Sequence, residues 1–229
     1  MRIALFDIDG TLLDSHGAGR RAVARALQVE LGVDLDQGLR LDGKTDPQIV
    51  GEALASLGHP AARDATSIDT VCRRYLSLLP EELASLSGGA TALPGVVPLL
   101  SALEAQPQVL LGLLTGNLAQ GARLKLESAG IAFGRFRVGA FGSDSPDRLA
   151  LPAVARERAK KLLGCPVEPS RLVVIGDTPA DVRCGREAGA RTIAVTTGRY
   201  NASALLAAGA DHVFATLEPA EAVLQAILA

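Results

Sequence analysis

The sequence predicts an α/β protein with a doubly wound, mainly parallel sheet and a helical segment inserted after the first strand. Three observations predict this fold. Short apolar runs recur along the chain, helical patterns separate most of them, and a long stretch near the N-terminus breaks the alternation. Near-continuous Val, Ile and Leu runs are typical of strands covered on both faces. Alternating strands and helices favour a parallel sheet between helical layers.

The elements of the sheet layer follow from these runs. Strands are expected at Ile3–Phe6, Val109–Leu114, Leu172–Ile175, Thr192–Val195 and His212–Phe214, with an additional one at Arg137–Phe141. Helices between them are expected at Leu118–Ala129, Leu151–Leu163, Pro179–Ala188 and Pro219–Leu228.

Residues 15–90 interrupt this alternation. They contain helical spacing without a convincing strand, and a single crossover needs far fewer residues. We therefore predict a helical domain, residues 15–89, that ends at Gly88-Gly89 and is inserted into a core domain of residues 1–14 and 90–229. Its helices are expected at Ala18–Leu31, Pro47–Leu57 and Ile68–Leu86.

Composition excludes several classes of protein. The 229 residues are 48% hydrophobic, which suits a packed core, and the net charge of −2 gives no basic surface for nucleic acid. Three widely spaced cysteines indicate neither a disulfide framework nor a zinc knuckle. No apolar run reaches the roughly 18 residues of a membrane span, and no signal peptide is apparent. We expect a cytoplasmic protein that uses neither nucleic acid nor membrane as a partner.

The first strand is followed by two carboxylates, Asp7 and Asp9, and then by Gly10. Residues two apart in an extended strand point to the same side. Two acids there repel each other unless a cation lies between them or one of them holds a proton. Both solutions indicate chemistry, although a strand followed by an ordinary Asp-Gly turn explains the same residues.

Two later strand ends are also polar, and ligands bind beyond the carboxyl ends of parallel strands. Thr115, Gly116 and Asn117 form a turn whose hydroxyl and amide groups suit an anion, or simply cap a helix. Asp177 and Asp181 follow the third strand end, where a dipole-matched helix cap accounts for one acid better than for two.

Oxygen ligands alone favour Mg²⁺ as the cofactor. The four acids Asp7, Asp9, Asp177 and Asp181 lie at the predicted sheet edge, whereas the three histidines occupy none of these strand ends. A zinc site is therefore not expected.

The order of these motifs resembles the haloacid dehalogenase-like hydrolase superfamily, which consists mostly of phosphatases. The resemblance covers residues 3 to about 200, and the insertion is similar to the helical cap of its phosphoglycolate phosphatase-like branch. It implies a Rossmann-like core with a cap domain. It also implies Mg²⁺-dependent hydrolysis of a small phosphorylated metabolite, with phosphoglycolate-like substrates included. Whether the protein is a monomer or a homodimer is left open.

The resemblance implies a role for each motif residue. Asp7 is the nucleophile that forms an aspartyl-phosphate, and Asp9 is the general acid and base. Thr115 and the amide of Gly116 hold phosphoryl oxygens, with help from Asn117. The metal ligands are Asp7, Asp9 through its main-chain carbonyl, Asp177 and Asp181.

The sequence departs from the superfamily at the cation that neutralises the phosphoryl charge. That residue is usually a Lys in a Lys-Pro pair, but none of the four lysines here precedes a Pro. Arg148 falls at the expected place, and Arg is chemically adequate for phosphate. Arg158 and Lys160 are the alternatives, and a solvated Arg at a helix start is the plain structural explanation. We predict that Arg148→Ala keeps the fold and lowers kcat more than tenfold.

The loop from Leu41 to Asp46 interrupts the helical insertion. In capped members of the superfamily such a loop closes over the site and recognises the leaving group of the substrate. Lys44 is therefore a candidate to attract a second anionic group of the substrate. A helix-capping turn with Thr45 or Asp46 as the cap explains the same residues, and the two interpretations are compatible.

Four alternatives belong to other functional classes. A 2-haloacid dehalogenase or a phosphonatase lacks the second acid, so Asp9 argues against both. A sugar-phosphate mutase keeps all the acids and stays open. A non-catalytic phosphate- or metal-binding regulatory domain is disfavoured by the intact acids.

Overall fold

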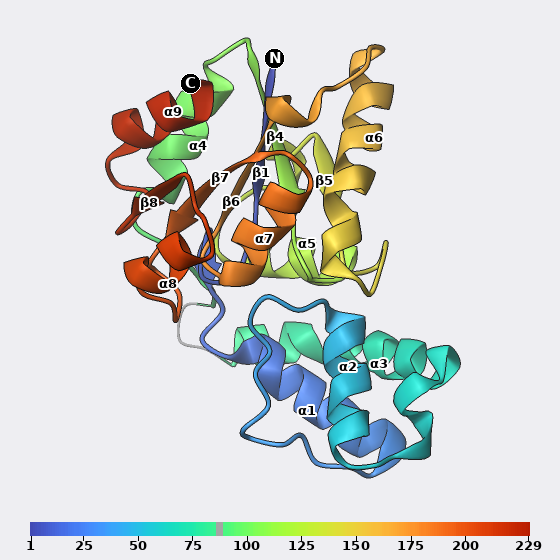
Figure 1. Ribbon diagram of the computed structural model, residues 1–229. Helices are drawn as coiled ribbons and strands as arrows, with labels where there is room; N and C mark the ends of the chain where they lie inside the picture. The colour runs from blue at the N-terminus through green and yellow to red at the C-terminus, as the bar shows by residue number, and fades with distance from the viewer. Residues whose placement is uncertain (86–88) are drawn as a thin grey trace.

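Six strands form one parallel sheet in the order β5-β4-β1-β6-β7-β8, with β1 between the two halves (Figure 1). The computed structural model describes residues 1–85 and 89–229. Gly88, at the predicted domain boundary, and Leu86, the predicted end of a helix, lie outside the described residues. The strands are β1 (Arg2–Phe6), β4 (Val109–Leu114), β5 (Val138–Ala140), β6 (Leu172–Gly176), β7 (Arg191–Val195) and β8 (His212–Phe214).

The sheet is doubly wound because the chain builds outward from β1 first toward β5 and then, on the other side, toward β8. Ile3 pairs with both Leu110 and Leu172, which fixes the register of the three central strands. Such a reversal of strand order opens a crevice at the carboxyl ends of the central strands, here after Phe6.

Alternate β1 side chains enter two separate cores, as the two-residue period of a strand requires. Ala4 and Phe6 pack with α4 and α9, whereas Ile3 and Leu5 pack with α6 and α7. These flanking helices are α4 (Val96–Glu104), α5 (Ala119–Ser128), α6 (Leu151–Leu163), α7 (Pro179–Glu187), α8 (Ala202–Ala207) and α9 (Ala220–Leu228). The six predicted strands and the doubly wound fold are confirmed, whereas α4 and α8 are helices that the patterns did not single out.

Three helices lie below the carboxyl end of the sheet in Figure 1. They are α1 (Ala18–Leu31), α2 (Asp46–Ser56) and α3 (Ala65–Ala84). Among the described residues of 15–90 there is no strand, as predicted. The chain leaves and re-enters the sheet layer through a small antiparallel pair, β2 (Leu13–Asp14) with β3 (Thr91–Ala92), which the sequence did not indicate. No helix within the described ranges has the length and apolarity needed to cross a membrane.

Candidate active site

The first strand delivers Asp7 to the edge of the sheet and then turns sharply at Gly10. The Asp7 amide donates to the carbonyl of Ile175 at 2.9 Å, so β1 stays paired with β6 up to this residue. Gly10 has φ +80°, and a Cβ there would lie 2.5 Å from Asp177 Oδ2. The turn therefore requires glycine for its conformation and for the close approach of Asp177.

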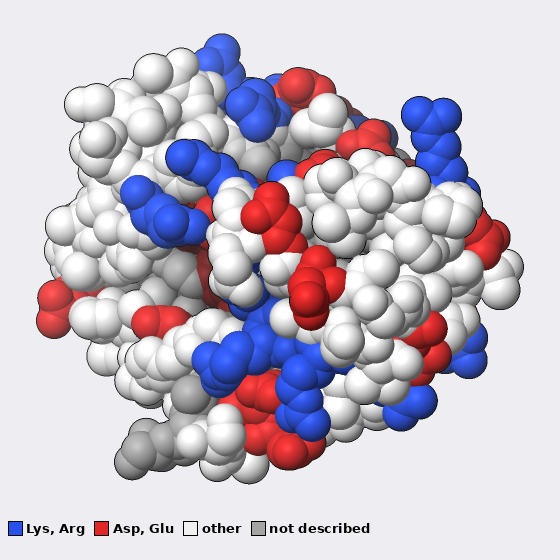
Figure 2. Space-filling model, turned by 90° about the horizontal axis from the view of Figure 1, so that it is seen from below, with Lys and Arg blue, Asp and Glu red and all other residues white. Residues whose placement is uncertain are grey.

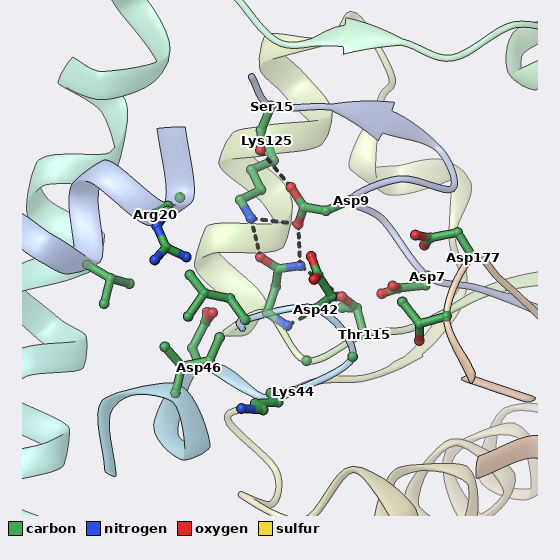
Figure 3. Close-up of a pocket in the computed structure, with 18 of the residues that line it drawn as sticks. Asp7, Asp9, Ser15, Arg20, Asp42, Lys44, Asp46, Thr115, Lys125 and Asp177 are labelled. Carbon is green, nitrogen blue, oxygen red and sulfur yellow. Dashed lines mark hydrogen bonds and ion pairs between the residues drawn. The ribbon is translucent and has the colours of Figure 1, made fainter. Parts of the chain in front are cut away.

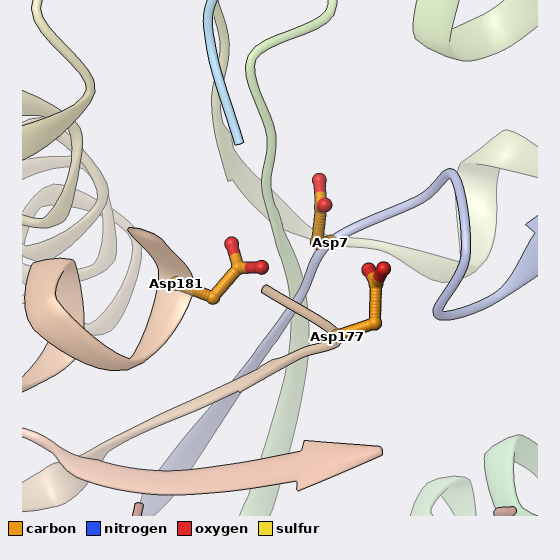
Figure 4. Close-up of side chains that lie close together, drawn as sticks. All are labelled: Asp7, Asp177 and Asp181. Atoms are coloured by element: carbon orange, nitrogen blue, oxygen red, sulfur yellow. The ribbon is translucent and has the colours of Figure 1, made fainter. Parts of the chain in front are cut away.

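Asp7, Asp177 and Asp181 form a buried carboxylate cluster (Figure 4). One oxygen of each lies within 4.8 Å of the others, so the three strand-end acids converge as predicted. Burial raises the pKa of Asp7 to about 6, even though Arg148 acts in the opposite direction. Burial also raises the pKa of Asp177, reinforced by the charges of Asp181 and Asp7. Concentrated negative charge of this kind fits a divalent cation with oxygen ligands.

The carboxylate cluster also contains a positively charged side chain, that of Arg148. Its Nη2 lies 3.3 Å from Asp7 Oδ1 and also donates to Asp181. The side chain is only 6% exposed, and its Nε has no hydrogen-bond partner among the described residues. One guanidinium against three carboxylates leaves an excess of negative charge for a metal ion to offset.

Asp181 also takes part in the capping box of α7, whose N-cap is Thr178. Its carboxylate accepts hydrogen bonds from the Thr178 amide at 3.0 Å and from the Thr178 hydroxyl at 2.7 Å. Asp181 therefore belongs both to the helix cap and to the acid cluster. The capping box fixes the Asp181 side chain against the end of β6.

The turn after β4 brings the predicted anion-binding residues next to Asp9. Asn117 Nδ2 donates to Thr115 Oγ1 at 2.9 Å and to Asp9 Oδ2 at 3.0 Å. Ser15 Oγ donates to the other oxygen of Asp9 at 2.7 Å. These bonds connect the second strand end to the acid that follows the first.

Lys125, on α5, completes this network (Figure 3). Its ammonium donates at 2.6 Å both to Asp9 Oδ2 and to Asn117 Oδ1. Burial alone would raise the pKa of Asp9, but Lys125 and the hydrogen bonds hold it below its ordinary value. Asp7 and Asp9 thus avoid mutual repulsion by having separate cations, Arg148 and Lys125.

The loop before α2 packs directly on the turn after β4. Thr45 is the N-cap of α2, as one interpretation predicts, and accepts from the Gln48 amide at 3.3 Å. The Asp46 amide donates to Gly116 O, and the Asp46 carboxylate accepts from the Leu118 amide, both at 2.8 Å. These bonds hold the loop closed over the site.

Lys44 lines the cavity but is already paired with Glu52 of α2. The sequence predicts that this ammonium is available for a second anionic group. Its observed partner makes that role weaker than the sequence suggests.

A cavity of about 290 Å³ lies between the strand ends and the helices α1 to α3. Figure 2, which views the molecule from the helical side, shows acidic and basic side chains interspersed on this face. The charged residues that line the cavity balance each other in number: Asp7, Asp9, Asp42, Asp46 and Asp177 against Arg20, Lys44, Lys125, Arg148 and Arg199.

Comparison with known proteins identifies the family. A family model described as HAD-hydrolase-like matches residues 150–220. The phosphoglycolate phosphatase of Rhodospirillum rubrum is 31% identical over 93% of this chain and 86% of its own length. The chain belongs to the haloacid dehalogenase-like hydrolases. The expected enzyme class, a phosphatase of this superfamily, is confirmed.

Other relatives of this haloacid dehalogenase-like chain are also phosphatases. The phosphoglycolate phosphatase of Chromobacterium violaceum is 30% identical over 92% of this chain and 90% of its own. Hexitol phosphatase A of Escherichia coli is 30% identical over 94% of both chains. A solved hydrolase from Pseudomonas syringae has 21% identity and a TM-score of 0.74 over 98% of both chains, which confirms the fold.

Of the three candidates for the missing superfamily Lys, only Arg148 lies in the acid cluster. Arg158 instead donates to Asp144 and to the carbonyl of Gly139. Lys160 is half-exposed and lies 3.4 Å from Glu157. The geometry therefore supports Arg148 over both alternatives.

Besides Ser15, which donates to Asp9, sequence reasoning missed Lys125. It lies on the buried face of α5 with Ala122 and Leu126, so the helical pattern alone suggests an ordinary core position. The available signal is its chemistry. A lysine on the apolar face of a helix that starts at a polar strand end needs a buried acid as its partner.

Proposed function

We propose that this protein is a Mg²⁺-dependent phosphomonoester hydrolase that acts on a small phosphorylated metabolite through an aspartyl-phosphate on Asp7. The observation that carries the proposal is the buried cluster of Asp7, Asp177 and Asp181 beside Arg148. A nucleophilic carboxylate, a metal site and a phosphate-binding cation then share one sheet edge. The segment 15–89 acts as the cap domain of this site.

The cluster fits the metal that the superfamily implies. Asp7, Asp177 and Asp181 would hold Mg²⁺, together with the main-chain carbonyl of Asp9. When bound, the ion supplies positive charge that offsets the repulsion between these carboxylates and the phosphoryl oxygens.

In the first step the Asp7 carboxylate attacks phosphorus, and the bond from phosphorus to the leaving-group oxygen breaks. Thr115 and the Gly116 amide hold the phosphoryl oxygens, and Arg148 stabilises their charge. Asp9 gives its proton to the departing oxygen. Lys125 opposes protonation of Asp9, whereas the negative charge of an incoming phosphate favours it.

In the second step water attacks the phosphorus of the aspartyl-phosphate. Asp9 takes the proton from this water, the bond between Asp7 and phosphorus breaks, and inorganic phosphate leaves. Asp9 is thereby protonated again for the next substrate. The presence of this second acid supports hydrolysis of phosphate esters over dehalogenation.

The test is turnover of p-nitrophenyl phosphate with Mg²⁺ and with a chelator. We expect Mg²⁺-dependent phosphate release that Asp7→Asn abolishes while thermal stability is kept. The exposed Asp69→Asn is the matched control. The proposal fails if no phosphomonoester is hydrolysed in the presence of Mg²⁺. A screen of phosphate esters then identifies the substrate, since relatives named for phosphoglycolate and for hexitol are about equally similar.

A further inference from the structure

Two polar groups that line the cavity have no contact with the substrate in the proposed chemistry. They are the Tyr75 hydroxyl on α3 and the Lys125 ammonium on α5, and both residues line the cavity. A methyl group placed on Gly19 of α1 would lie 3.1 Å from Lys125 Nζ and 4.0 Å from Tyr75 Oη. The two groups therefore converge on one point beside α1, where the glycine leaves room.

Both groups have unused hydrogen-bonding capacity. Tyr75 is 1% exposed, and its hydroxyl has no partner among the described residues. Lys125 is 5% exposed and uses two of its three donors, on Asp9 and Asn117. Buried polar groups are nearly always satisfied, so an unpaired hydroxyl beside a cavity indicates a partner that the chain does not supply.

The surrounding charge favours a neutral partner. Asp9 already pairs with Lys125, and the buried carboxyl of Asp46 lines the same cavity. A substrate carboxylate beside Lys125 would meet both of these acids. The Nη atoms of Arg20 donate to three backbone carbonyls between residues 36 and 39, so they face that loop.

We propose that Lys125 and Tyr75 form a subsite for a neutral hydroxyl of the leaving group, so that the enzyme prefers phosphate esters of polyols. The substrate hydroxyl accepts a hydrogen bond from the Lys125 ammonium and exchanges one with the Tyr75 hydroxyl. This inference rests on the proposed phosphatase function and assigns its substrate class.

The test compares kcat/KM for three esters: glycerol 1-phosphate, propyl phosphate and 2-phosphoglycolate. Glycerol 1-phosphate carries a hydroxyl next to the ester carbon, propyl phosphate carries no such group, and 2-phosphoglycolate carries a carboxylate. We expect kcat/KM for glycerol 1-phosphate to exceed that for propyl phosphate about twenty-five-fold, since each of the two hydrogen bonds contributes a factor of about five. It should also exceed that for 2-phosphoglycolate.

Tyr75→Phe removes only the hydroxyl and should lower the preference for glycerol 1-phosphate over propyl phosphate about fivefold. Its thermal stability should not fall, because the hydroxyl it loses has no partner in the free enzyme. Tyr200→Phe is the matched control, since Tyr200 packs in a separate cluster with Val182 and Leu205. Gly19→Ala, which fills the recess at a helical position, should lower the same preference.

The outcomes separate the two proposals. If no ester is hydrolysed with Mg²⁺, the result contradicts both the proposed function and the proposed subsite. If esters are hydrolysed but glycerol 1-phosphate has no advantage, or if Tyr75→Phe leaves its advantage unchanged, the subsite is wrong and the phosphatase stands. A preference for 2-phosphoglycolate that Tyr75→Phe does not change would likewise overturn it.

Discussion

Arg148 Nη2 lies 3.3 Å from Asp7 Oδ1, and both side chains are buried. This contact connects the proposed nucleophile to a guanidinium that also binds Asp181. The charges of Asp181 and Asp7 raise the pKa of Arg148 against the effect of burial, so the side chain stays cationic at every pH of interest. A phosphoryl group on Asp7 would meet this charge directly.

Replacing Arg148 should impair both turnover and stability. Arg148→Ala removes the cation beside Asp7, so we expect kcat to fall more than tenfold. It also leaves buried carboxylates without a partner, which costs about 3 kcal/mol or more of unfolding free energy without metal. Steady-state kinetics and urea unfolding measure the two effects. Arg158→Ala, whose side chain pairs with Asp144, is the control, and equal losses in the two variants would contradict the assignment.

Metal binding should be visible without turnover. Mg²⁺ that binds the acid cluster of the folded state raises the midpoint of thermal unfolding with concentration. Asp177→Asn should abolish this rise. The apo variant should be at least as stable as the parent, since burial and neighbouring acids raise the pKa of Asp177. Asp69→Asn should respond like the parent. A Mg²⁺ response in Asp177→Asn equal to that of the parent would remove this residue from the metal site.

Asp9→Asn should separate the two chemical steps. p-Nitrophenolate leaves without a proton donor, so Asp7 should still be phosphorylated, whereas water attack lacks its base. We expect a burst of about one equivalent of p-nitrophenolate followed by slow turnover. Mass spectrometry after an acid quench should find the phosphoryl group on the peptide that contains Asp7. Phosphate on another residue, or full steady turnover, would refute the roles given to the two acids.

The sheet and the acid cluster could be predicted because their signals are local. Each buried strand is an apolar run, and the parallel topology brings Asp7 and Asp177 to one edge without further information. Lys125 and Tyr75 could not be predicted in the same way. The sequences of their helices show the ordinary pattern of a helix that faces a core, and only tertiary packing brings the two side chains to Gly19. The pairing of β2 with β3 joins segments that are distant in sequence and just two residues long, too short for a periodic signal.

Asp46 should make stability depend on pH. Burial raises its pKa from 3.8 to about 6, with Lys125 acting the other way. The folded state therefore holds this proton where the unfolded state has lost it. The stability that the protonated group contributes is complete below pH 4 and is lost as pH rises through 6. In Asp46→Asn the side-chain oxygen can still accept from the Leu118 amide. The unfolding free energy of this variant should therefore rise relative to that of the parent as pH increases over this range, by about 3 kcal/mol above pH 7.

Urea unfolding in chelator between pH 4 and 8 measures this difference. Asp7 contributes a pH dependence of the same sign in both proteins, because burial also raises its pKa to about 6, so the comparison must be between variants. Asp69→Asn serves as the reference for an exposed acid. A constant difference between Asp46→Asn and the parent across this range would show that Asp46 does not titrate there.

Gly116 should be required for closure of the loop over the site. A Cβ there would lie 1.9 Å from the carbonyl oxygen of Lys44 and 2.9 Å from the Cα of Thr45. Both contacts are with backbone, so no side chain can turn aside to relieve them. Gly116→Ala should therefore displace the loop and break its hydrogen bonds through Asp46. Because displacements of about 1 Å can cost a hundredfold in rate, we expect kcat/KM to fall about a hundredfold.

Gly134→Ala is the matched control, since a Cβ at Gly134 would have no neighbour within 4 Å. Circular dichroism and thermal unfolding should show that both variants keep the sheet, because the clash at Gly116 lies outside the two sheet cores. The loss should therefore appear in kcat/KM and not in the fold. Turnover of Gly116→Ala near that of the parent would mean that the loop works from another position, and that the contact between Asp46 and Leu118 is not needed during catalysis.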